Sequence, residues 1–336
     1  MEKEYCLGWH LVYDALRDYY YSFGESVQKE FNHFYDPLHF FAPDSLTVGI
    51  PLSVGVCVST GKCHVVMARH IYEQLADFIH QKIPQVPEFQ LESLTPAEYE
   101  IIDRFEAFTP NILSKGHQRA KKKTKQLTRI RQAHEEAALA KRLVNSSNYV
   151  FVSIDIEAYE KDHSILLEIG WSMYDASTNT CMDQHYINDQ YRHLLNGQFV
   201  EDQKERFNYG TSVWCSLKQA LIELRKDLDW AVKRDGGFVL VGHGLDSDLK
   251  YLAEQNFLWP GRHGGDVASI EDSAKVTILN TDTIYGASIN DLHNPPSLGR
   301  TLALFHIDTW NLHNAGNDAH YTLLLLLKLV HDNCDI

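Results

Sequence analysis

This sequence of 336 residues has few cysteines, no C-x-x-C pair and no long hydrophobic run. The scattered cysteines give no support to zinc ribbons, zinc fingers or thioredoxin-like motifs, and they favour a reduced intracellular compartment. The longest aliphatic run, Leu323 to Leu327, ends at Lys328 and is far too short to span a bilayer. We therefore expect no association with a membrane. The six cysteines are Cys6, Cys57, Cys63, Cys181, Cys215 and Cys334.

A targeting signal is also missing from the first residues. No basic stretch precedes an apolar one in MEKEYCLGWH, and early acids such as Glu2 and Glu4 are unusual in a mitochondrial presequence. These features predict a cytoplasmic or nuclear location. With 19 Gly, 10 Pro and 44% hydrophobic residues, the composition is that of a globular protein, and the length suggests about two domains.

Basic residues are outnumbered, 31 against 45 acids, so the formal charge is −14 and a wholly basic nucleic-acid coat is excluded. Residues 115–131 nevertheless hold eight Lys or Arg and no acid, and residues 118–143 contain no Gly or Pro, which predicts a long helix. Like charges four residues apart repel one another on a helix. This segment is therefore either a solvated linker helix or a surface for an anionic partner, such as nucleic acid. For the latter we select Lys121, Lys122, Lys123, Lys125 and Arg129.

The chain divides into three regions of different character. Residues 1–95 combine an aromatic-rich helix, a β-hairpin before His70 and a helix from about Ile71 to Ile83, which predicts a small α+β module. It carries no chemical signature, so we expect it to pack or to bind a protein partner. Residues 96–146 are predicted to be a helical, basic linker that begins at the capping-box spacing of Thr95-Pro96-Ala97-Glu98.

Residues 147–336 are predicted to form one α/β domain. Three strands come first, and helices and strands then alternate, which favours a mixed sheet flanked by helices. The tryptophans of this region, at positions 171, 214, 230, 259 and 310, are expected in the core. The expected strands are 148–157, 165–175, 181–189, 238–244 and 275–284, and the expected helices are 216–234, 245–255, 297–307 and 317–333.

Two acids, Asp155 and Glu157, end the first strand of this domain. Because side chains alternate along a strand, these two carboxylates point to the same side. Two carboxylates side by side at the end of a buried strand are costly unless a cation lies between them. A divalent metal ion is the usual partner of such a pair.

Two later segments supply further candidates. Asp246 and Asp248 begin a helix directly after a buried strand. We assign Asp246 as the helix cap and Asp248 as a metal ligand, because Asp248 lies too far into the helix to cap it. His313 precedes Asp318 by five residues, and the Gly-containing loop between them leads into a long apolar helix. Together these residues predict metal-dependent hydrolysis of an anionic substrate.

The spacing of these residues resembles a known family. D-x-E at Asp155, the E-I-G strand from Glu168, G-H-x-x-x-x-D-x-x-x-L from Gly242 and H-x-x-x-x-D from His313 are similar to the three motifs of DEDDh 3′–5′ exonucleases. These enzymes have a ribonuclease H-like fold. The resemblance covers about residues 149–331. The segments HYINDQYRHLLNG, ERFNYG and SLGRTLALFHIDTWNLHNAGNDAHYT resemble a fungal group of such exonuclease-like proteins.

The resemblance implies a role for each motif residue. Asp155, Glu157, Asp248 and Asp318 would hold two Mg²⁺ or Mn²⁺ ions, with Glu157 also counted as catalytic, and His313 would take the proton of the attacking water. The substrate would be single-stranded nucleic acid, with RNA slightly favoured over DNA, and the products nucleoside 5′-monophosphates released from a 3′ end.

Some positions depart from the family pattern. Ala158-Tyr159-Glu160 stands where many relatives have Thr-Thr-Gly, and Gly244 and Ser247 stand where Asn and Phe are common. In the family these positions lie near the terminal nucleotide, and Tyr159 either stacks on a terminal base or packs at the strand end. Two other functions remain open. One is an adaptor that binds RNA or protein with little turnover, and the other is an endonuclease or strand-transfer enzyme of the same fold.

Overall fold

The computed structural model describes residues 2–90 and 94–332. The chain divides into two compact units, residues 1–129 and 130–336. None of the helices in the described ranges is long and apolar enough to cross a membrane. The five cysteines that lie within these ranges are free thiols, and Cys334 falls outside them.

The first unit is built on a closed barrel of four antiparallel strands in the order β1-β3-β2-β4. Aromatic and aliphatic side chains of the helices, among them Leu16, Tyr20, Phe31 and Leu75, form one core with the barrel. The predicted hairpin is confirmed as β2 and β3. The strands are β1 (Glu2–Gly8), β2 (Ile50–Cys57), β3 (Cys63–Ala68) and β4 (Ala97–Ala107), and the helices are α1 (Trp9–Tyr21), α2 (Glu25–Tyr35), α3 (Pro37–Phe40) and α4 (Arg69–Lys82).

The helix predicted to begin at Pro96 is wrong over its first part, because residues 97–107 form strand β4. Tyr99, Ile101 and Ala107 are buried at odd-numbered positions, which is the period of a strand. Pairing of β4 with both β1 and β2 closes the barrel. The local capping-box spacing was therefore overridden by burial of one face of the segment in a sheet.

The long helix predicted over residues 118–143 is confirmed as α5 (Pro110–Ser146). Its first half belongs to the first unit, where Ala120 packs against Val54 and Cys63. Its last turns belong to the second unit, where Ala140 and Val144 join the core.

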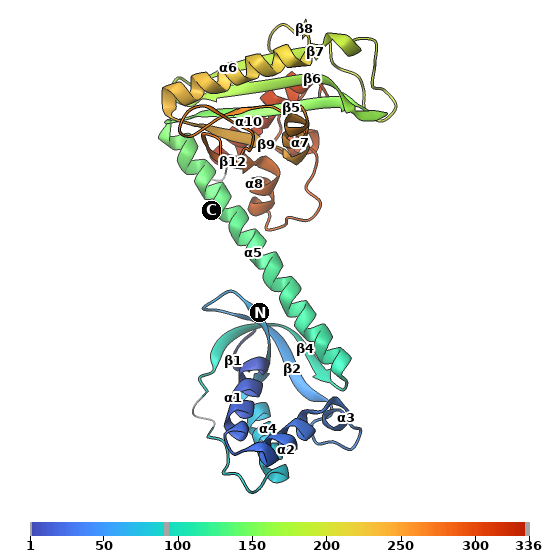
Figure 1. The fold of residues 1–336 in the computed structure, drawn as a ribbon, viewed down its shortest axis with the longest axis vertical. Coiled ribbons are helices and arrows are strands. Elements are labelled where there is room, and N and C mark those ends of the chain that lie inside the picture. Colours follow the sequence, from blue (N-terminus) through green and yellow to red (C-terminus); the bar gives the residue numbers. More distant parts are fainter. Residues whose placement is uncertain (1, 91–93, 333–336) are drawn as a thin grey trace. The chain divides into compact units, whose positions relative to one another are not determined.

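The second unit is centred on a six-stranded mixed sheet in the order β12-β9-β5-β6-β7-β8 (Figure 1). Strands β5, β6 and β7 are antiparallel neighbours, whereas β9 runs parallel to β5 and β12 parallel to β9. The predicted mixed sheet flanked by helices is confirmed. The strands are β5 (Val150–Tyr159), β6 (Asp162–Asp175), β7 (Thr180–Asn188), β8 (Val213–Cys215), β9 (Phe238–Gly242) and β12 (Lys275–Asn280), with a small pair β10 (Trp259–Pro260) and β11 (Asp266–Val267).

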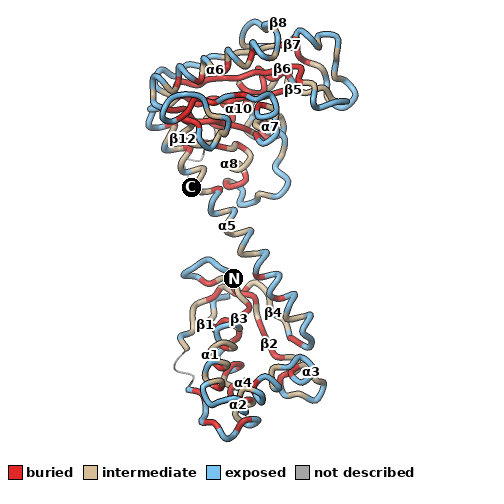
Figure 2. The backbone as a smooth tube through the Cα atoms, in the orientation of Figure 1, coloured by how far each residue is buried: buried red, intermediate tan, exposed pale blue. Residues whose placement is uncertain are grey.

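Helices cover both faces of this sheet. Val150, Val152 and Ile154 of β5 pack on the side of helix α6, whereas Phe151 packs on the side of helix α10. The central strands are accordingly buried along most of their length (Figure 2). The helical segments are η2 (Asp189–Tyr191), α6 (Leu217–Asp235), α7 (Asp246–Glu254), α8 (Thr281–Ser288), α9 (Leu298–Leu304) and α10 (Ala315–Asp332).

Two expectations for this unit are corrected. The strand expected over 275–284 ends at Asn280, and Thr281 begins helix α8 instead. Of the tryptophans expected in the core, Trp171 and Trp259 are buried, but Trp214, Trp230 and Trp310 are exposed. Arginine side chains lie over two of these exposed rings, Arg192 over Trp214 and Arg234 over Trp230. A cationic neighbour therefore accounts for an indole at the surface in those two cases.

Candidate metal centre

The acids Asp155 and Glu157 lie in the second half of strand β5, on the face of the sheet that α10 covers. Residue 151 faces α10, and the alternation of the strand carries positions 153, 155 and 157 to the same face. The neighbouring strand β6 places Gly170 opposite Asp155 and Glu168 opposite Glu157. The sequence-predicted pair is therefore brought together as expected.

Asp248 reaches the same strand from α7. Its Oδ1 accepts a hydrogen bond from the backbone N–H of Ile156 at 2.9 Å, between the two acids of β5. The prediction that Asp246 caps this helix is wrong, because the N-cap is Leu245 and no side chain caps it. Asp246 is the first residue of the helix and is exposed, so its charge favours the helix N-terminus without reaching the amides that a cap would bind.

His313 and Asp318 lie at the start of α10. The backbone N–H of His313 donates to Asp318 Oδ2 at 2.9 Å, and the His313 backbone is in the left-handed region with φ 67°. Asp318 is buried, whereas His313 is exposed. One ligand atom each of Glu157, His313 and Asp318 lies within 4.8 Å of the other two. The loop thus places the side chain of His313 next to Glu157 and Asp318.

Burial is the main cause that raises the pKa values of all four acids. Burial raises the pKa values of Asp155 and Glu157 well above their ordinary range, and nearby carboxylates, including Asp248 and Asp318, raise them further. Burial raises the pKa values of Asp248 and Asp318 to about 7. The cluster therefore disfavours its own full ionisation when no cation is present.

Two carboxylate oxygens of this cluster indicate which kind of ligand would fit it. Asp155 Oδ2 and Asp318 Oδ1 are buried and have no hydrogen-bond partner anywhere in residues 2–90 and 94–332. A buried carboxylate oxygen without a donor is rare because its desolvation is not compensated. Carboxylate oxygens are the ligands that Mg²⁺ and Mn²⁺ prefer. The donor set therefore fits a divalent cation.

A second buried pair, Glu168 and His185, adjoins the acids and was not among the predicted site residues. Glu168 Oε2 and His185 Nε2 are 2.8 Å apart, and the backbone N–H of Ala315 donates to the same oxygen at 3.3 Å. Burial raises the pKa of Glu168 to about 8 and lowers that of His185 to about 4. The position of Glu168 opposite Glu157 on a paired strand is the signal that could have found it.

Glu160, at one of the positions that depart from the family pattern, stabilises a loop. Its carboxylate accepts backbone N–H groups of Gly197, Gln198 and Phe199 at 2.9 to 3.2 Å. Asn196 accepts from the backbone N–H of Glu160 and donates to the Ala158 carbonyl. A loop with the exposed side chain of Phe199 is thereby held at the end of β5. Tyr159 is half-buried beside it, where the β5–β6 pairing becomes irregular.

The predicted nucleic-acid-binding cations lie in the first unit, on α5. Lys121, Lys122, Lys125 and Arg129 are exposed, and within the described residues none of them forms an ion pair, whereas Lys123 donates to Gln126 at 3.4 Å. Their role in binding stays a prediction.

Comparisons with known proteins agree with the motif pattern. The family model described as DNA polymerase III subunit epsilon-like, C-terminal domain (DEDDh_C), matches residues 150–329. "Good for full DBP5 activity protein 2" of Saccharomyces cerevisiae is 31% identical over 215 residues, which cover 58% of this chain and 37% of that protein. An uncharacterized protein of the same yeast is 33% identical over 206 residues, covering 56% and 42%. The chain thus spans about two fifths of the length of these two relatives.

A third relative matches over most of its length. An uncharacterized nucleolar protein of Schizosaccharomyces pombe is 32% identical over 222 residues, which cover 64% of this chain and 80% of that protein. Among solved structures, the RNase domain of the yeast Pop2 protein aligns with a TM-score of 0.34 and 15% identity, covering 59% of this chain and 82% of that one.

Proposed function

The chain belongs to the DEDDh family described as DNA polymerase III subunit epsilon-like, and on that premise we propose that it is a metal-dependent 3′–5′ exonuclease. Its substrate is single-stranded nucleic acid, with RNA favoured over DNA. The products are nucleoside 5′-monophosphates released one at a time from the 3′ end.

The observation that carries this proposal is the pair of buried carboxylate oxygens without a donor, Asp155 Oδ2 and Asp318 Oδ1. They belong to a cluster of four acids whose pKa values are all raised, chiefly by burial, and an exposed histidine lies within reach. A structural role alone would not leave these oxygens uncompensated. Asp155, Glu157, Asp248 and Asp318 would hold the ions, either Mg²⁺ or Mn²⁺.

Two such ions, when bound, supply charge stabilisation at the phosphate and a more acidic water. The protein's own groups orient the reactants and accept a proton. His313 takes a proton from the attacking water at a ring nitrogen, and its exposed position lets that proton pass to solvent. The hydrogen bond from its backbone N–H to Asp318 holds the histidine beside a proposed ligand. The Glu168–His185 pair supports the start of α10, because the backbone N–H of Ala315 donates to the Glu168 carboxyl group.

The exposed cations of α5 and the ring of Tyr159 would contact the nucleic acid, and the first unit would bind a protein partner. A nuclear or cytoplasmic location is proposed, and the fission-yeast relative is named as nucleolar.

The test uses single-stranded RNA and DNA of one sequence, labelled at the 5′ end and incubated with Mg²⁺ or Mn²⁺. We expect a ladder that shortens from the 3′ end, faster for RNA, and release of 5′-monophosphates. His313→Ala should abolish it. His306→Ala is the matched control, because His306 is also exposed and also has a left-handed backbone, with φ 56°, but lies outside the cluster.

Two other results would overturn the proposal. Cleavage of a circular single strand would show an endonuclease, because a circle has no 3′ end. An intact label in every lane, from a folded protein that still binds RNA, would show the adaptor function instead.

A further inference from the structure

A groove on the first unit gathers cationic side chains from three separate parts of the chain. It has a volume of about 560 Å³ and lies between the start of α1, the turn into β3, and α5. Six of its lining residues carry or can carry a positive charge, and no carboxylate is among the described residues that line it. The six are His10, Lys62, His64, His117, Lys121 and Lys125.

One wall of the groove is a stripe along α5. Residues 117, 121 and 125 are four positions apart, so they lie along one face of the helix. Next to this stripe, Thr124 Oγ1 accepts the backbone N–H of Cys63 at 2.8 Å, and Ala120 packs against the same residue. These contacts fix the stripe beside β3, which contributes His64. The groove is therefore a built feature of the unit.

The charges in the groove lack partners within the unit. Lys62, Lys121 and Lys125 form no ion pair with any residue in the described ranges, whereas Arg119 on the same helix pairs with Asp103. Burial and the nearby side chains of His10 and Lys62 lower the pKa of His64, and burial and His10 lower that of His117. An anion in the groove would relieve this repulsion.

The groove also offers an aromatic surface. The rings of His10 and His64 are stacked, with centroids 5.3 Å apart and planes inclined by 28°, and His10 is exposed. Nucleobases stack on flat side chains of this kind, which favours a nucleic acid as the occupant of the groove. Phosphate-directed lysines next to a stacking surface are the combination that proteins use for single strands.

We propose that this groove is a holding site for single-stranded nucleic acid, with Lys62, Lys121 and Lys125 on the phosphates and the His10–His64 stack against a base. The choice of polymer rests on the proposed function. Of the five cations predicted on α5 to bind nucleic acid, Lys121 and Lys125 line the groove. His64 of β3 and His10 of α1 also line it, and neither was among the predicted site residues.

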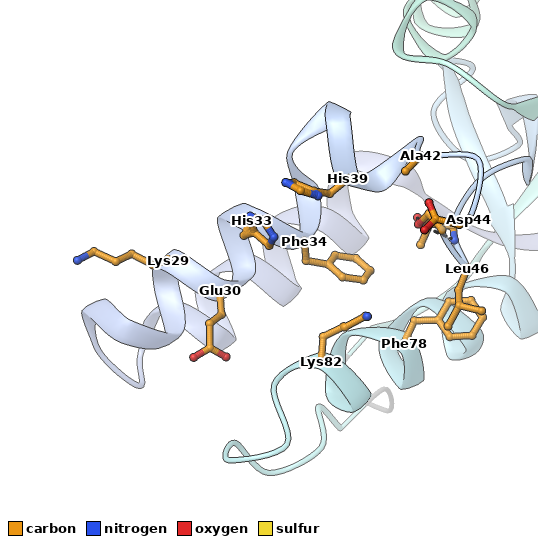
Figure 3. A pocket seen from close by; sticks show the side chains of 12 residues that line it. Lys29, Glu30, His33, Phe34, His39, Ala42, Asp44, Leu46, Phe78 and Lys82 are labelled. Atoms are coloured by element: carbon orange, nitrogen blue, oxygen red, sulfur yellow. Dashed lines mark hydrogen bonds between the residues drawn. The ribbon is translucent and has the colours of Figure 1, made fainter.

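Another pocket of the same unit supplies a control. It has a volume of about 550 Å³ and lies among α2, α3 and α4. Here two lysines, Lys29 and Lys82, share the lining with two acids, Glu30 and Asp44, whose charges offset those of the lysines (Figure 3). Neutralising its lysines removes the same charge from the protein as neutralising Lys121 and Lys125, at a site that we do not expect to bind nucleic acid.

The experiment measures binding of a 30-nucleotide RNA to the full chain by fluorescence anisotropy, in EDTA so that no turnover occurs, over a series of salt concentrations. Lys121→Gln with Lys125→Gln should weaken binding about tenfold or more and reduce the slope of log K against log salt by about 1.4, since each phosphate contact to a single strand contributes about 0.7. Lys29→Gln with Lys82→Gln should change neither. His10→Ala should weaken binding about fivefold or more with the slope unchanged.

An unchanged salt slope in the groove variant, or an equal loss in the pocket variant, would overturn the proposal. So would competition by polyglutamate as strong as that by unlabelled RNA, which would assign the groove to acidic proteins. Binding without degradation would contradict the exonuclease only, and degradation without groove-dependent binding would contradict the holding site only.

Discussion

Gly170 of β6 lies directly against Ala315, the first residue of α10. A Cβ atom at position 170 would come within 2.3 Å of the Ala315 carbonyl carbon and of the Gly316 nitrogen. Gly170 is also the residue paired with Asp155 across the β5–β6 ladder. The absence of a side chain at this one position therefore allows the helix that carries Asp318 to approach the strand that carries Asp155.

Gly170→Ala should separate the two halves of the metal centre. The added methyl group would clash with backbone atoms of α10. Because backbone atoms cannot move aside by a change of rotamer, the start of that helix must shift. We expect a loss of about 1–3 kcal/mol in the free energy of unfolding and a loss of nuclease activity larger than that destabilisation explains. Activity is measured well below the melting temperature of the variant.

Gly61→Ala is the comparison for this variant, since open space surrounds its Cβ and it lies in the first unit. It should keep full activity, with only the cost of a left-handed backbone at φ 67°. Wild-type activity in Gly170→Ala would contradict the close approach of α10 to β6.

Asp155→Asn should abolish turnover without unfolding the protein. Removal of one buried charge from a cluster of like charges should leave the metal-free protein as stable as the wild type or more stable. Activity should fall by roughly 10³-fold or more, because several kcal/mol of charge stabilisation would be lost. Melting temperatures are measured in EDTA and in Mn²⁺, and the rise that Mn²⁺ produces in the wild type should disappear.

Asp246→Asn is the matched control, because Asp246 is an exposed acid on the same helix as Asp248. It should retain both activity and the response to Mn²⁺. A variant of Asp155 that still gains stability from Mn²⁺ would remove Asp155 from the ligand set.

The stability of the metal-free protein should fall as the pH rises through 7. The pKa values of Asp248 and Asp318 are raised from 3.8 to about 7 in the folded state. The folded state therefore holds more protons than the unfolded chain, so their contribution is fully present below about pH 4 and is lost above pH 7. Urea unfolding in EDTA at pH 6.5 and 8.5 should show a decrease of more than ~1 kcal/mol.

Saturating Mg²⁺ should reduce that pH dependence, because bound cations keep the carboxylates ionised at both pH values. The interval begins at pH 6.5 so that His185, with its lowered pKa of about 4, stays neutral throughout. A metal-free protein equally stable at pH 6.5 and 8.5 would contradict the raised pKa values of the cluster.

Asp175 and Arg234 should stabilise the second unit except at low pH. Arg234, in the last turn of α6, donates through both terminal nitrogens to the buried carboxylate of Asp175 and lowers its pKa, as do hydrogen bonds from Ser177. A lowered pKa gives stability that is present above the unfolded value near 4 and is lost as the pH falls. Asp175→Asn should therefore cost about 2–4 kcal/mol at pH 7 and less at pH 3, measured by urea unfolding.

Glu223→Gln provides the comparison on the same helix. It breaks the pair of Glu223 with Lys226 at the surface, where an ion pair contributes less than about 1 kcal/mol. An effect of Asp175→Asn no larger than this one would show that the Asp175–Arg234 pair is energetically unimportant.

Much of the candidate site could be predicted because it depends on short-range spacing. Asp155 and Glu157 share a face since strand side chains alternate, and the loop between His313 and Asp318 is only a few residues long. The bounds of α6 could likewise be predicted from local residues. The Ser216 side chain caps the start of this helix, and Gly236 follows its last residue with φ 76°.

Other features depend on residues far apart in the chain, and for these the local sequence patterns gave either no prediction or a wrong one. Residues 97–107 carry a helix-start spacing, yet pairing with β1 and β2 makes them a strand. The partner of Glu168 is His185, on the next strand, and the need for glycine at 170 arises only from the approach of α10.

The groove of the first unit shows the same division. The run of lysines on α5 is visible in the sequence, but only the packing of Ala120 and Thr124 on β3 decides which face of the helix meets His64 and His10. Spacing along a strand or helix settles which side chains share a face, because backbone geometry repeats every two or 3.6 residues. Which faces then meet is settled by burial of apolar surface between distant segments, and that is a property of the whole fold.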